Sequence, residues 1–482
     1  MKKVGGLALL LLLLPASALA QERAPDDETT LKAEPNGISA DAVAKRAAET
    51  SYQAKAAEQS LRGAAARVDA AWAAFLPRLT TVASYTRLSD LTPPSLGTLI
   101  VSKQPPGPIS SFTDAQGNPT IIAQPLSFPI VLNNWLFQAT LSVPISDYFL
   151  RINQNYTAAT HARDAARYDI ASAKTKSAAD GKIAFYNWLR AKGTLVVAKL
   201  ALEDQKTHLT DTKNLATAGN ATQVDVLRGE TAVAASELAV VQTQNLLELA
   251  DKQLRIAMHV DDAATVASSE TLDAAPLAGI QGNLPALINE AQSQRFEVRS
   301  IDANAESARQ QAKVQRAGAY PIVTAFADGI VANPNQRIFP QSDAFTPTWD
   351  VGARITWSPN DIPTALAGAA DLESRAANLI AQKQVLRDGI AIEVTQAFQA
   401  AQEADFALGS TEKQLVSARE AVRVARELFK AGRVNSTTLT DAETELTRAR
   451  LSLLNARIDA RTARVRVEHA TGRDSRLVQM NP

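Results

Sequence analysis

The chain has 482 residues, and its 50 lysine and arginine residues balance 50 aspartate and glutamate residues. Because an average domain has roughly 150 residues, this length predicts several domains or one elongated body. The balanced charge disfavours a basic nucleic-acid-binding protein. The absence of cysteine excludes disulfides, thiolate metal sites, cysteine nucleophiles and a thioether-linked lipid anchor.

Candidate catalytic and metal-binding residues are scarce. The four histidines stand in separate helix-like stretches, without an HExxH motif or a paired-carboxylate setting: His161, His208, His259 and His469. We expect them to be solvated residues of helix surfaces. No nucleophile–base pair, glycine-rich phosphate loop or metal cluster is visible, so we expect neither an enzyme nor a cofactor or metal site.

The N-terminus has the layout of a secretory signal peptide over residues 1–20. Lys2 and Lys3 precede the apolar run 7–14, and Ala18-Leu19-Ala20 follows as a small-x-small cleavage site. No later segment approaches the roughly 20 apolar residues that a spanning helix requires. This pattern predicts export to the periplasm or outer membrane, and it leaves a secreted fate open.

The C-terminal third carries a sustained heptad pattern. From Leu439 to Ala470, apolar or small residues alternate in steps of three and four, which predicts a coiled-coil helix. A second apolar line through Leu451, Leu454 and Ile458 lies on another face of that helix. The helix therefore is expected to have neighbours on two sides.

An internal repeat organises the chain. Moving back 213 residues from the heptad reaches a similar pattern, and the correspondence includes the glycines Gly219 and Gly432. Glycine can take the left-handed conformation that ends a helix. Each half is therefore predicted to contain a helical hairpin, at about 151–258 and about 364–471.

Candidate N-caps follow each glycine. We expect Thr222 to cap the helix after the first turn, and Ser436 with Thr437 to cap the helix after the second. The preceding helix in the first half contains no proline over 151–219 and would reach roughly 100 Å at 1.5 Å per residue. A filamentous coiled coil is the alternative interpretation of such long helices.

The segments between the hairpins favour strands over a filament. Four stretches contain β-branched or aromatic residues in partial alternation, at about 78–90, 134–147, 320–331 and 348–358. Aromatic residues near their ends resemble an interfacial girdle: Trp135, Phe137, Tyr148, Phe149, Trp349 and Trp357. A soluble sandwich core is the alternative. Since about eight strands are the fewest that close a transmembrane barrel, several chains would have to combine their strands.

The segment 91–133 is rich in proline and glycine, which excludes a helix and disfavours a central strand. It lengthens the first half relative to the second, so we interpret it as an inserted loop. Long loops on one side of a barrel normally face the cell exterior.

At the two glycine turns the sequence resembles the TolC family of outer-membrane efflux proteins. The residues that carry the resemblance are AGNATQVDVL at 218–227 and FKAGRVNSTTLTDA at 429–442. The resemblance implies a mainly α fold with a small β part, built from two tandem repeats. It further implies a trimeric β-barrel, with four strands from each chain, that continues into a long periplasmic α-helical coiled-coil barrel.

This resemblance divides the chain into five segments. They are the signal peptide 1–20, a first repeat 21–258, a linker or equatorial segment 259–283, a second repeat 284–472 and a C-terminal tail 473–482.

The resemblance also assigns candidate site residues. The turns would dock an adaptor through Gly219, Asn220, Ala221, Gly432, Arg433 and Val434, and a periplasmic gate would contain Asp225, Phe429, Thr438 and Asp441. Thr438 stands where family members have an inner aspartate, Val434 where they have a basic residue, and Phe429 where they have tyrosine. An ordinary solvated helix residue is the alternative interpretation of Asp441.

The function implied is passive conduction through the outer membrane in a tripartite efflux or type I secretion system. The implied partners are two further copies of the chain, a periplasmic adaptor, an inner-membrane transporter and outer-membrane lipid, with no nucleic acid. The implied location is the outer membrane, with an extension into the periplasm. A periplasmic or surface structural coiled-coil protein, such as a fibre or adhesin, is the alternative.

Overall fold

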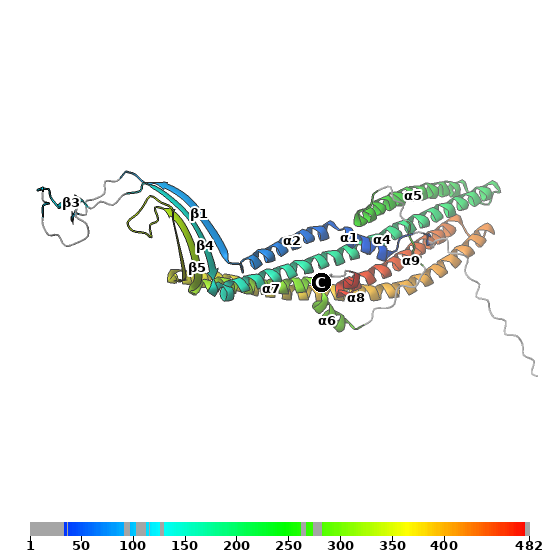
Figure 1. Cartoon of the computed structure of the whole chain (residues 1–482). Coiled ribbons are helices and arrows are strands. Elements are labelled where there is room, and N and C mark those ends of the chain that lie inside the picture. Colours follow the sequence, from blue (N-terminus) through cyan, green and yellow to red (C-terminus); the bar gives the residue numbers. More distant parts are fainter. Residues whose placement is uncertain are drawn as a thin grey trace, which may run out of the picture. The chain divides into compact units, whose positions relative to one another are not determined.

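A computed structural model describes residues 33–35, 37–90, 97–102, 112–114, 116–125, 130–261, 267–272 and 282–477. The predicted signal peptide, most of the proline-rich part of the inserted loop and the tail after 477 lie outside these residues. The described chain is mainly helical with a small antiparallel sheet, and this confirms the predicted fold class (Figure 1).

Two compact units make up the chain. The first contains the described residues up to Ser51, Lys174–Ala291 and those from Ile392 onwards, and the second contains Tyr52–Ala173 and Gln292–Ala391. The long helices α4 (Asn153–Thr217) and α8 (Ile362–Lys430) contribute residues to both units. Each half of the sequence therefore supplies elements to each unit.

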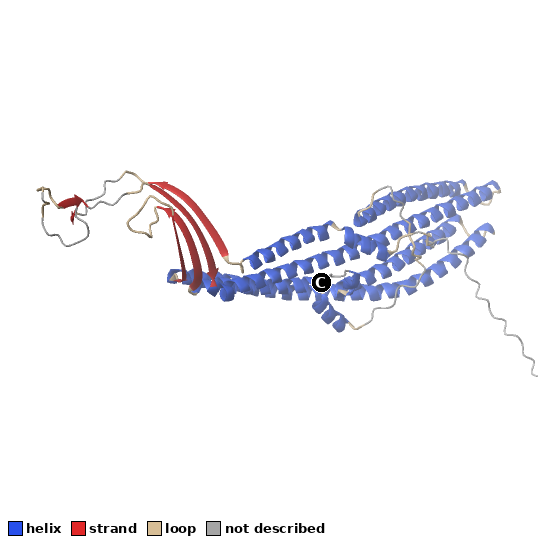
Figure 2. Ribbon diagram, in the orientation of Figure 1, coloured by secondary structure: helices blue, strands red, loops and turns tan. Residues whose placement is uncertain are grey.

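The second unit contains a four-stranded antiparallel sheet (Figure 2), and its strands lie in the order β1-β4-β5-β6. Its strands are β1 (Arg78–Arg87), β4 (Asn133–Pro144), β5 (Ile322–Asn333) and β6 (Thr346–Thr356). A separate hairpin pairs β2 (Thr98–Ser102) with β3 (Ile121–Pro125). The helical elements of this unit are α2 (Tyr52–Ala73), α3 (Ile145–Asp147), a π-helix (Tyr148–Ile152), α7 (Phe296–Arg316), 3-10 turns at Ala317–Ala319 and Pro359–Asp361, and the adjoining parts of α4 and α8.

The second predicted strand ends earlier than expected. Pro144, which has no N–H to donate to a sheet ladder, ends β4, and the chain turns directly into α3. Tyr148 accordingly lies in the π-helix, where its hydroxyl donates to the Phe75 carbonyl at 2.9 Å. It is therefore an anchor between elements and not a strand residue.

Strand register gives the sheet two chemically distinct faces. Residues of equal parity pair throughout, for example Leu141 with Leu79 on β1 and with Ala327 on β5. Because side chains alternate along a strand, all odd-numbered residues share one face. This odd face carries Leu79, Thr81, Ala83 and Tyr85 on β1; Trp135, Phe137, Ala139, Leu141 and Val143 on β4; Val323, Ala325, Ala327, Gly329 and Val331 on β5; and Pro347, Trp349, Val351, Ala353 and Ile355 on β6.

The odd face is apolar and exposed in the single chain. Trp349 is 78% exposed and Trp135 is 41% exposed, so these aromatics do not form a sandwich core within the chain. The even-numbered face carries the polar residues: Gln138 and the Thr140 hydroxyl both donate to the Asp328 carboxylate. Asp328 in turn pairs across the ladder with Asp350.

The first unit is a helical assembly. It contains α1 (Ala40–Thr50), α5 (Gln223–Met258), α9 (Ser436–Thr471), a 3-10 turn at Arg473–Leu477, and the adjoining parts of α4 and α8; α6 (Leu284–Gln294) begins in it. Phe185, Leu189, Leu254 and Ile458 from α4, α5 and α9 belong to one buried apolar cluster. Ile38 pairs in parallel with Ser268, so the N-terminal segment and the linker join at one edge of this unit.

Within the described residues, no helix combines the length and apolarity needed to cross a bilayer.

Candidate functional site

The two hairpin turns have the same glycine geometry. Gly219 has a φ of 81° and Gly432 a φ of 68°, both in the left-handed region that favours glycine. An added Cβ would meet no atom within 4 Å at either position, so the backbone conformation is what requires glycine here. Both glycines lie on the surface of the first unit.

Backbone hydrogen bonds close both turns in the same way. The Asn220 N–H donates to the Leu215 carbonyl at 2.8 Å, and the Arg433 N–H donates to the Leu428 carbonyl at 2.9 Å. The donors and the acceptors are each 213 residues apart, since 433 − 220 and 428 − 215 both equal 213. These six-to-one bonds satisfy the last helix carbonyls, as in a Schellman motif.

The first turn is followed by a reciprocal capping box. The Asp225 N–H donates to the Thr222 hydroxyl at 3.2 Å, and the Thr222 N–H and hydroxyl both donate to the Asp225 carboxylate, at 3.1 and 2.6 Å. These bonds from Thr222 and the nearby Arg228 lower the pKa of Asp225 below its ordinary value. Within one chain, the Asp225 carboxylate is therefore bound to its own turn.

The cap of the second turn differs from the prediction. The Asn435 side chain, and not Ser436 or Thr437, accepts from the Thr438 N–H at 3.0 Å and from the Thr438 hydroxyl at 2.7 Å. Asn435 occupies the place that Thr222 has in the first repeat, since 435 − 222 equals 213. Ser436 is buried, and its hydroxyl lies 2.9 Å from His208 Nε2.

The remaining predicted tip residues lie at the surface or beside it. Asn220 and Arg433 are exposed, while Ala221 and Val434 are half-buried. Val434 packs against the buried cluster of Ala425, Phe429 and Leu439.

The predicted gate residues do not come together in a single chain. Phe429 is buried, and its ring stacks on the His208 ring with centroids 5.3 Å apart. Thr438 is held by its cap and Asp225 by its own turn. Asp441 is exposed, and its carboxylate has no ion pair or hydrogen bond within the described chain.

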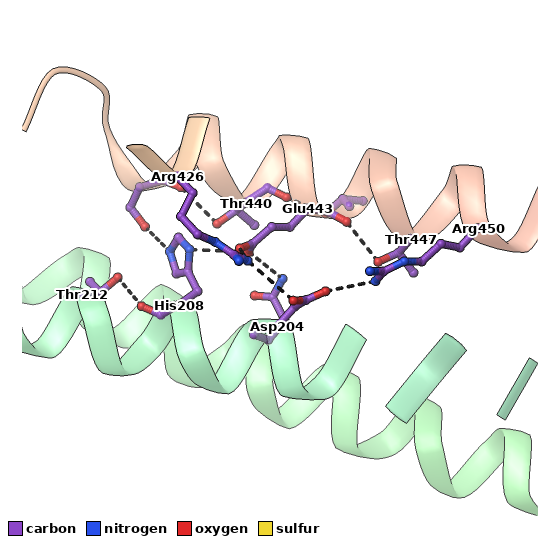
Figure 3. A network of polar contacts seen from close by, with 11 residues as sticks. Asp204, His208, Thr212, Arg426, Thr440, Glu443, Thr447 and Arg450 are labelled. Carbon is purple, nitrogen blue, oxygen red and sulfur yellow. Dashed lines mark hydrogen bonds and ion pairs between the residues drawn. The ribbon is translucent and has the colours of Figure 1, made fainter. Parts of the chain in front are cut away.

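A buried polar cluster near the second turn was not predicted (Figure 3). Glu443 of α9, which is 2% exposed, accepts from Arg426 of α8 at 3.2 Å and from Gln205 of α4 at 3.3 Å. His208 of α4, which is 3% exposed, places its Nδ1 at 3.5 Å from Glu443 Oε2. Asp204 of α4 adds contacts to Arg426 at 3.5 Å and to Arg450 of α9 at 3.0 Å. The cluster therefore joins three helices.

Burial sets the protonation states of this cluster. It raises the pKa of Glu443 to about 7 against the opposing effect of Arg426, and the carboxylates of Asp204 and Asp211 raise it further. Burial also lowers the pKa of His208, as does Arg426, while Asp211 acts in the opposite direction. Both groups are therefore biased toward their neutral forms.

The expectation of four solvated histidines is wrong. His208 is buried, His161 and His469 are half-buried, and only His259 is exposed. Helical periodicity alone did not distinguish these environments, because His208 is covered by residues of α8 and α9 that are distant in the sequence. Among the described residues, no group of three or more histidine, aspartate and glutamate side chains is arranged to hold a metal ion.

Tandem helical hairpins and a sheet with one exposed apolar face define a two-repeat membrane channel subunit. A sequence model of the outer membrane efflux protein family matches residues 43–258 and 287–473. The chain therefore belongs to the outer membrane efflux protein family, and this confirms the resemblance to TolC proteins.

Solved structures of outer-membrane channels have a similar fold. CusC is 14% identical with a TM-score of 0.72, over 90% of this chain and 93% of that chain. The outer membrane protein VceC of Vibrio cholerae is 16% identical with a TM-score of 0.69, over 90% and 96%. The CmeC outer membrane channel of Campylobacter jejuni is 15% identical with a TM-score of 0.68, over 92% and 93%. No curated protein sequence matches the chain.

Family membership places the protein in the outer membrane, with an extension into the periplasm. Proteins of this family are efflux channels and not enzymes.

Proposed function

We propose that this protein is the outer-membrane channel of a tripartite efflux or type I secretion system. It passively conducts substrates that an inner-membrane transporter and a periplasmic adaptor deliver, and it releases them outside the cell. The chain performs no bond chemistry in this process.

The observation that carries the proposal is the division of the sheet into two faces. The odd face exposes Trp135, Leu141, Trp349 and Val351 in the single chain, while the opposite face carries Asp328 with its polar partners. A transmembrane barrel requires this alternation, with apolar residues toward lipid and polar residues toward the lumen.

The sheet edges support assembly with other copies. β1 and β6 are the edge strands of the four-stranded sheet. Unpaired strand edges are not tolerated in lipid, so these edges must pair with further chains. Three protomers supply twelve strands and close one barrel.

The hairpin turns are proposed as the contact with the adaptor. Gly219, Asn220 and Ala221 in the first turn and Gly432, Arg433 and Val434 in the second present backbone groups to a partner, and glycine permits its close approach. Asp225, Phe429, Thr438 and Asp441 are proposed to belong to the gate behind these turns. Since Phe429 and Asp225 are engaged within their own chain, Asp441 is the gate residue that is free to face the pore.

We propose a division of the chain that follows the two repeats. Residues 1–20 direct export, 21–258 and 284–472 are the two repeats, 259–283 form the linker and 473–482 the tail.

Electrical recording of the purified protein in planar bilayers tests the proposal. We expect heat-modifiable trimers in the outer-membrane fraction and stable single-channel currents after reconstitution. A protein that fractionates without the membrane and gives no current would instead support a structural coiled-coil role.

A further inference from the structure

We propose that His208 and Glu443 form a buried lock that ties the α8–α9 hairpin to α4 near the second turn, and that the hairpin leaves α4 only when this pair opens to water. The consequence for gating rests on the proposed channel function. The lock itself concerns one chain and can be measured without any current.

The contacts of Glu443 reach across both hairpins. Its bond with Arg426 lies within the α8–α9 hairpin, whereas its contacts with Gln205 and His208 reach α4 of the first hairpin. His208 is held in turn by Ser436 at its other ring nitrogen and by the stacked ring of Phe429. Separation of the α8–α9 hairpin from α4 would break the contacts of Glu443 with Gln205 and His208 together with those of His208 with Ser436 and Phe429, and it would leave the Arg426–Glu443 bond intact.

The first repeat supplies a natural comparison. Lys213 and Glu230 occupy the places of Arg426 and Glu443, since 426 − 213 and 443 − 230 both equal 213. Their ion pair is 2.9 Å long, but both side chains are about half-exposed, 50% and 48%. The residue equivalent to His208 in the other repeat is Ala421 of α8, since 421 − 208 also equals 213. The exposed pair therefore has no histidine beside it. The lock is thus a property of one hairpin only.

Opening the pair changes the charge on both members. In the closed state, burial favours neutral Glu443 and neutral His208, while Arg426, Arg450, Asp204 and Asp211 are the surrounding charged groups. In water, the carboxyl would ionise above its ordinary pKa of 4.5 and the imidazole would be protonated below its ordinary pKa of 6.5. Opening between these pH values therefore moves a proton from the carboxyl to the imidazole.

The two groups give opposite pH dependences. The pKa of Glu443 is raised to about 7, so its contribution to the closed state is complete below 4.5 and is lost as the pH rises to 7. The pKa of His208 is lowered, so its contribution is complete above 6.5 and is lost as the pH falls through the lowered pKa. In the parent chain the two effects oppose each other between pH 4.5 and pH 6.5.

Amide hydrogen exchange of the purified full-length protein tests the lock. We compare residues 436–446 of α9 with the equivalent residues 223–233 of α5, from pH 5 to pH 8, after correction for the intrinsic exchange rate. In the parent we expect greater protection in α9 at every pH. Equal protection in the two segments overturns the proposal, and this comparison needs no variant.

Variants then separate the two members of the pair. In Glu443→Gln only His208 titrates, so protection of residues 436–446 should fall as the pH drops below 6.5. In His208→Gln only Glu443 titrates, so protection should fall by up to roughly tenfold per pH unit as the pH rises toward 7, and then level off.

Glu230→Gln is the matched control, and it should keep the parent profile in α9. The proposal is overturned if Glu443→Gln and His208→Gln share one pH profile. If hydrogen exchange contradicts the lock, the proposed channel function still stands. If the protein shows no channel activity, hydrogen exchange can still support the lock.

Discussion

Glu230 and Glu443 occupy equivalent positions of the two repeats, yet the Glu230 side chain is 48% exposed and that of Glu443 only 1%. Both glutamates face a basic residue 17 positions earlier, across a glycine turn of the same geometry. The local sequence is therefore symmetric, and the asymmetry comes from Gln205 and His208 of α4, which contact Glu443 of the second pair. The two hairpins are built alike but are attached differently.

The two faces of the sheet predict which substitutions the membrane tolerates. Leu141→Lys places a charge on the odd face and should destabilise the inserted protein by about 2–4 kcal/mol if the site lies near mid-bilayer. Ser142→Lys, on the even face of the same strand, should assemble nearly normally. Heat-modifiable trimers in the outer-membrane fraction provide the measurement.

A full lysine scan of 135–143 extends this test. Assembly defects should alternate with a period of two residues, strong at odd positions and weak at even positions. Uniform defects, or none at either parity, would contradict the assignment of the odd face to lipid.

The first capping box predicts that the stability of the first turn of α5 depends on pH. Thr222→Ala removes the hydroxyl that binds the Asp225 N–H, at a cost of about 1 kcal/mol in local stability. Because the pKa of Asp225 is lowered, its contribution is present above its ordinary 3.8 and is lost as the pH falls through the lowered value.

Hydrogen exchange in the first turn of α5 measures this effect. Thr222→Ala should raise exchange at pH 7 and reduce the difference between pH 7 and pH 3, because the backbone N–H of residue 222 and Arg228 still interact with the Asp225 carboxylate. Asn435→Ala is the matched control, since the second cap contains no carboxylate and should weaken α9 equally at both pH values. An unchanged pH dependence in Thr222→Ala would show that another group titrates.

Much of the fold followed from periodicity and the repeat. Gly219 and Gly432 were recognisable as turns because a left-handed position after a long helix nearly requires glycine. The fold class followed from strand-like segments such as that around Trp135, placed between long helices. These features depend on local sequence, which is why they could be predicted from a single sequence.

The buried cluster could not be predicted in the same way. Glu443 looks like any charged residue of a helix, and its burial depends on Gln205 and His208, which lie more than two hundred residues earlier. Asn435 was missed as a cap for a related reason: asparagine, serine and threonine all cap helices, and the local sequence offered three adjacent candidates. The repeat offset from Thr222 was the signal that selects Asn435.

The inserted loop predicts a site that is reachable from outside the cell. Gly117 has a positive φ and open space around it, within a turn that the Asp114 carboxylate holds through the Gln116 and Asn118 N–H groups. An epitope inserted after Gly117 should be labelled on intact cells and should leave conduction unchanged, because added loop length costs little entropy. Labelling only after permeabilisation of the outer membrane would reverse the proposed orientation.

The second turn predicts a substitution that blocks docking without blocking assembly. Gly432→Trp should abolish efflux and adaptor crosslinking while trimers remain in the membrane, since the side chain would stand between the turn and its partner. Gly432→Asn is the control, because asparagine tolerates the left-handed conformation that costs other residues roughly 1–2 kcal/mol. Normal efflux in Gly432→Trp would remove this turn from the docking surface.

Asp441 carries the last prediction, which concerns the charge of the gate. Three symmetric copies of an unpaired carboxylate around a narrow pore would attract cations strongly. Asp441→Ala should therefore raise the concentration of a trivalent cation that half-blocks the single-channel current from the periplasmic side. We expect an increase of about tenfold, equivalent to ~1.4 kcal/mol. Glu445→Ala is the matched control, since Glu445 lies one turn further along α9 but is paired with Arg448.

A second substitution tests the same gate in the opposite direction. Thr438→Asp adds a carboxylate one turn before Asp441, at a position where an acidic residue also favours the helix N-terminus. The added ring of charge should lower the half-blocking concentration, whereas the Glu445→Ala control should leave it unchanged. If cation block is the same in Asp441→Ala, Thr438→Asp and the parent, these residues do not line the pore. Asp441 would then be an ordinary solvated residue on the surface of α9.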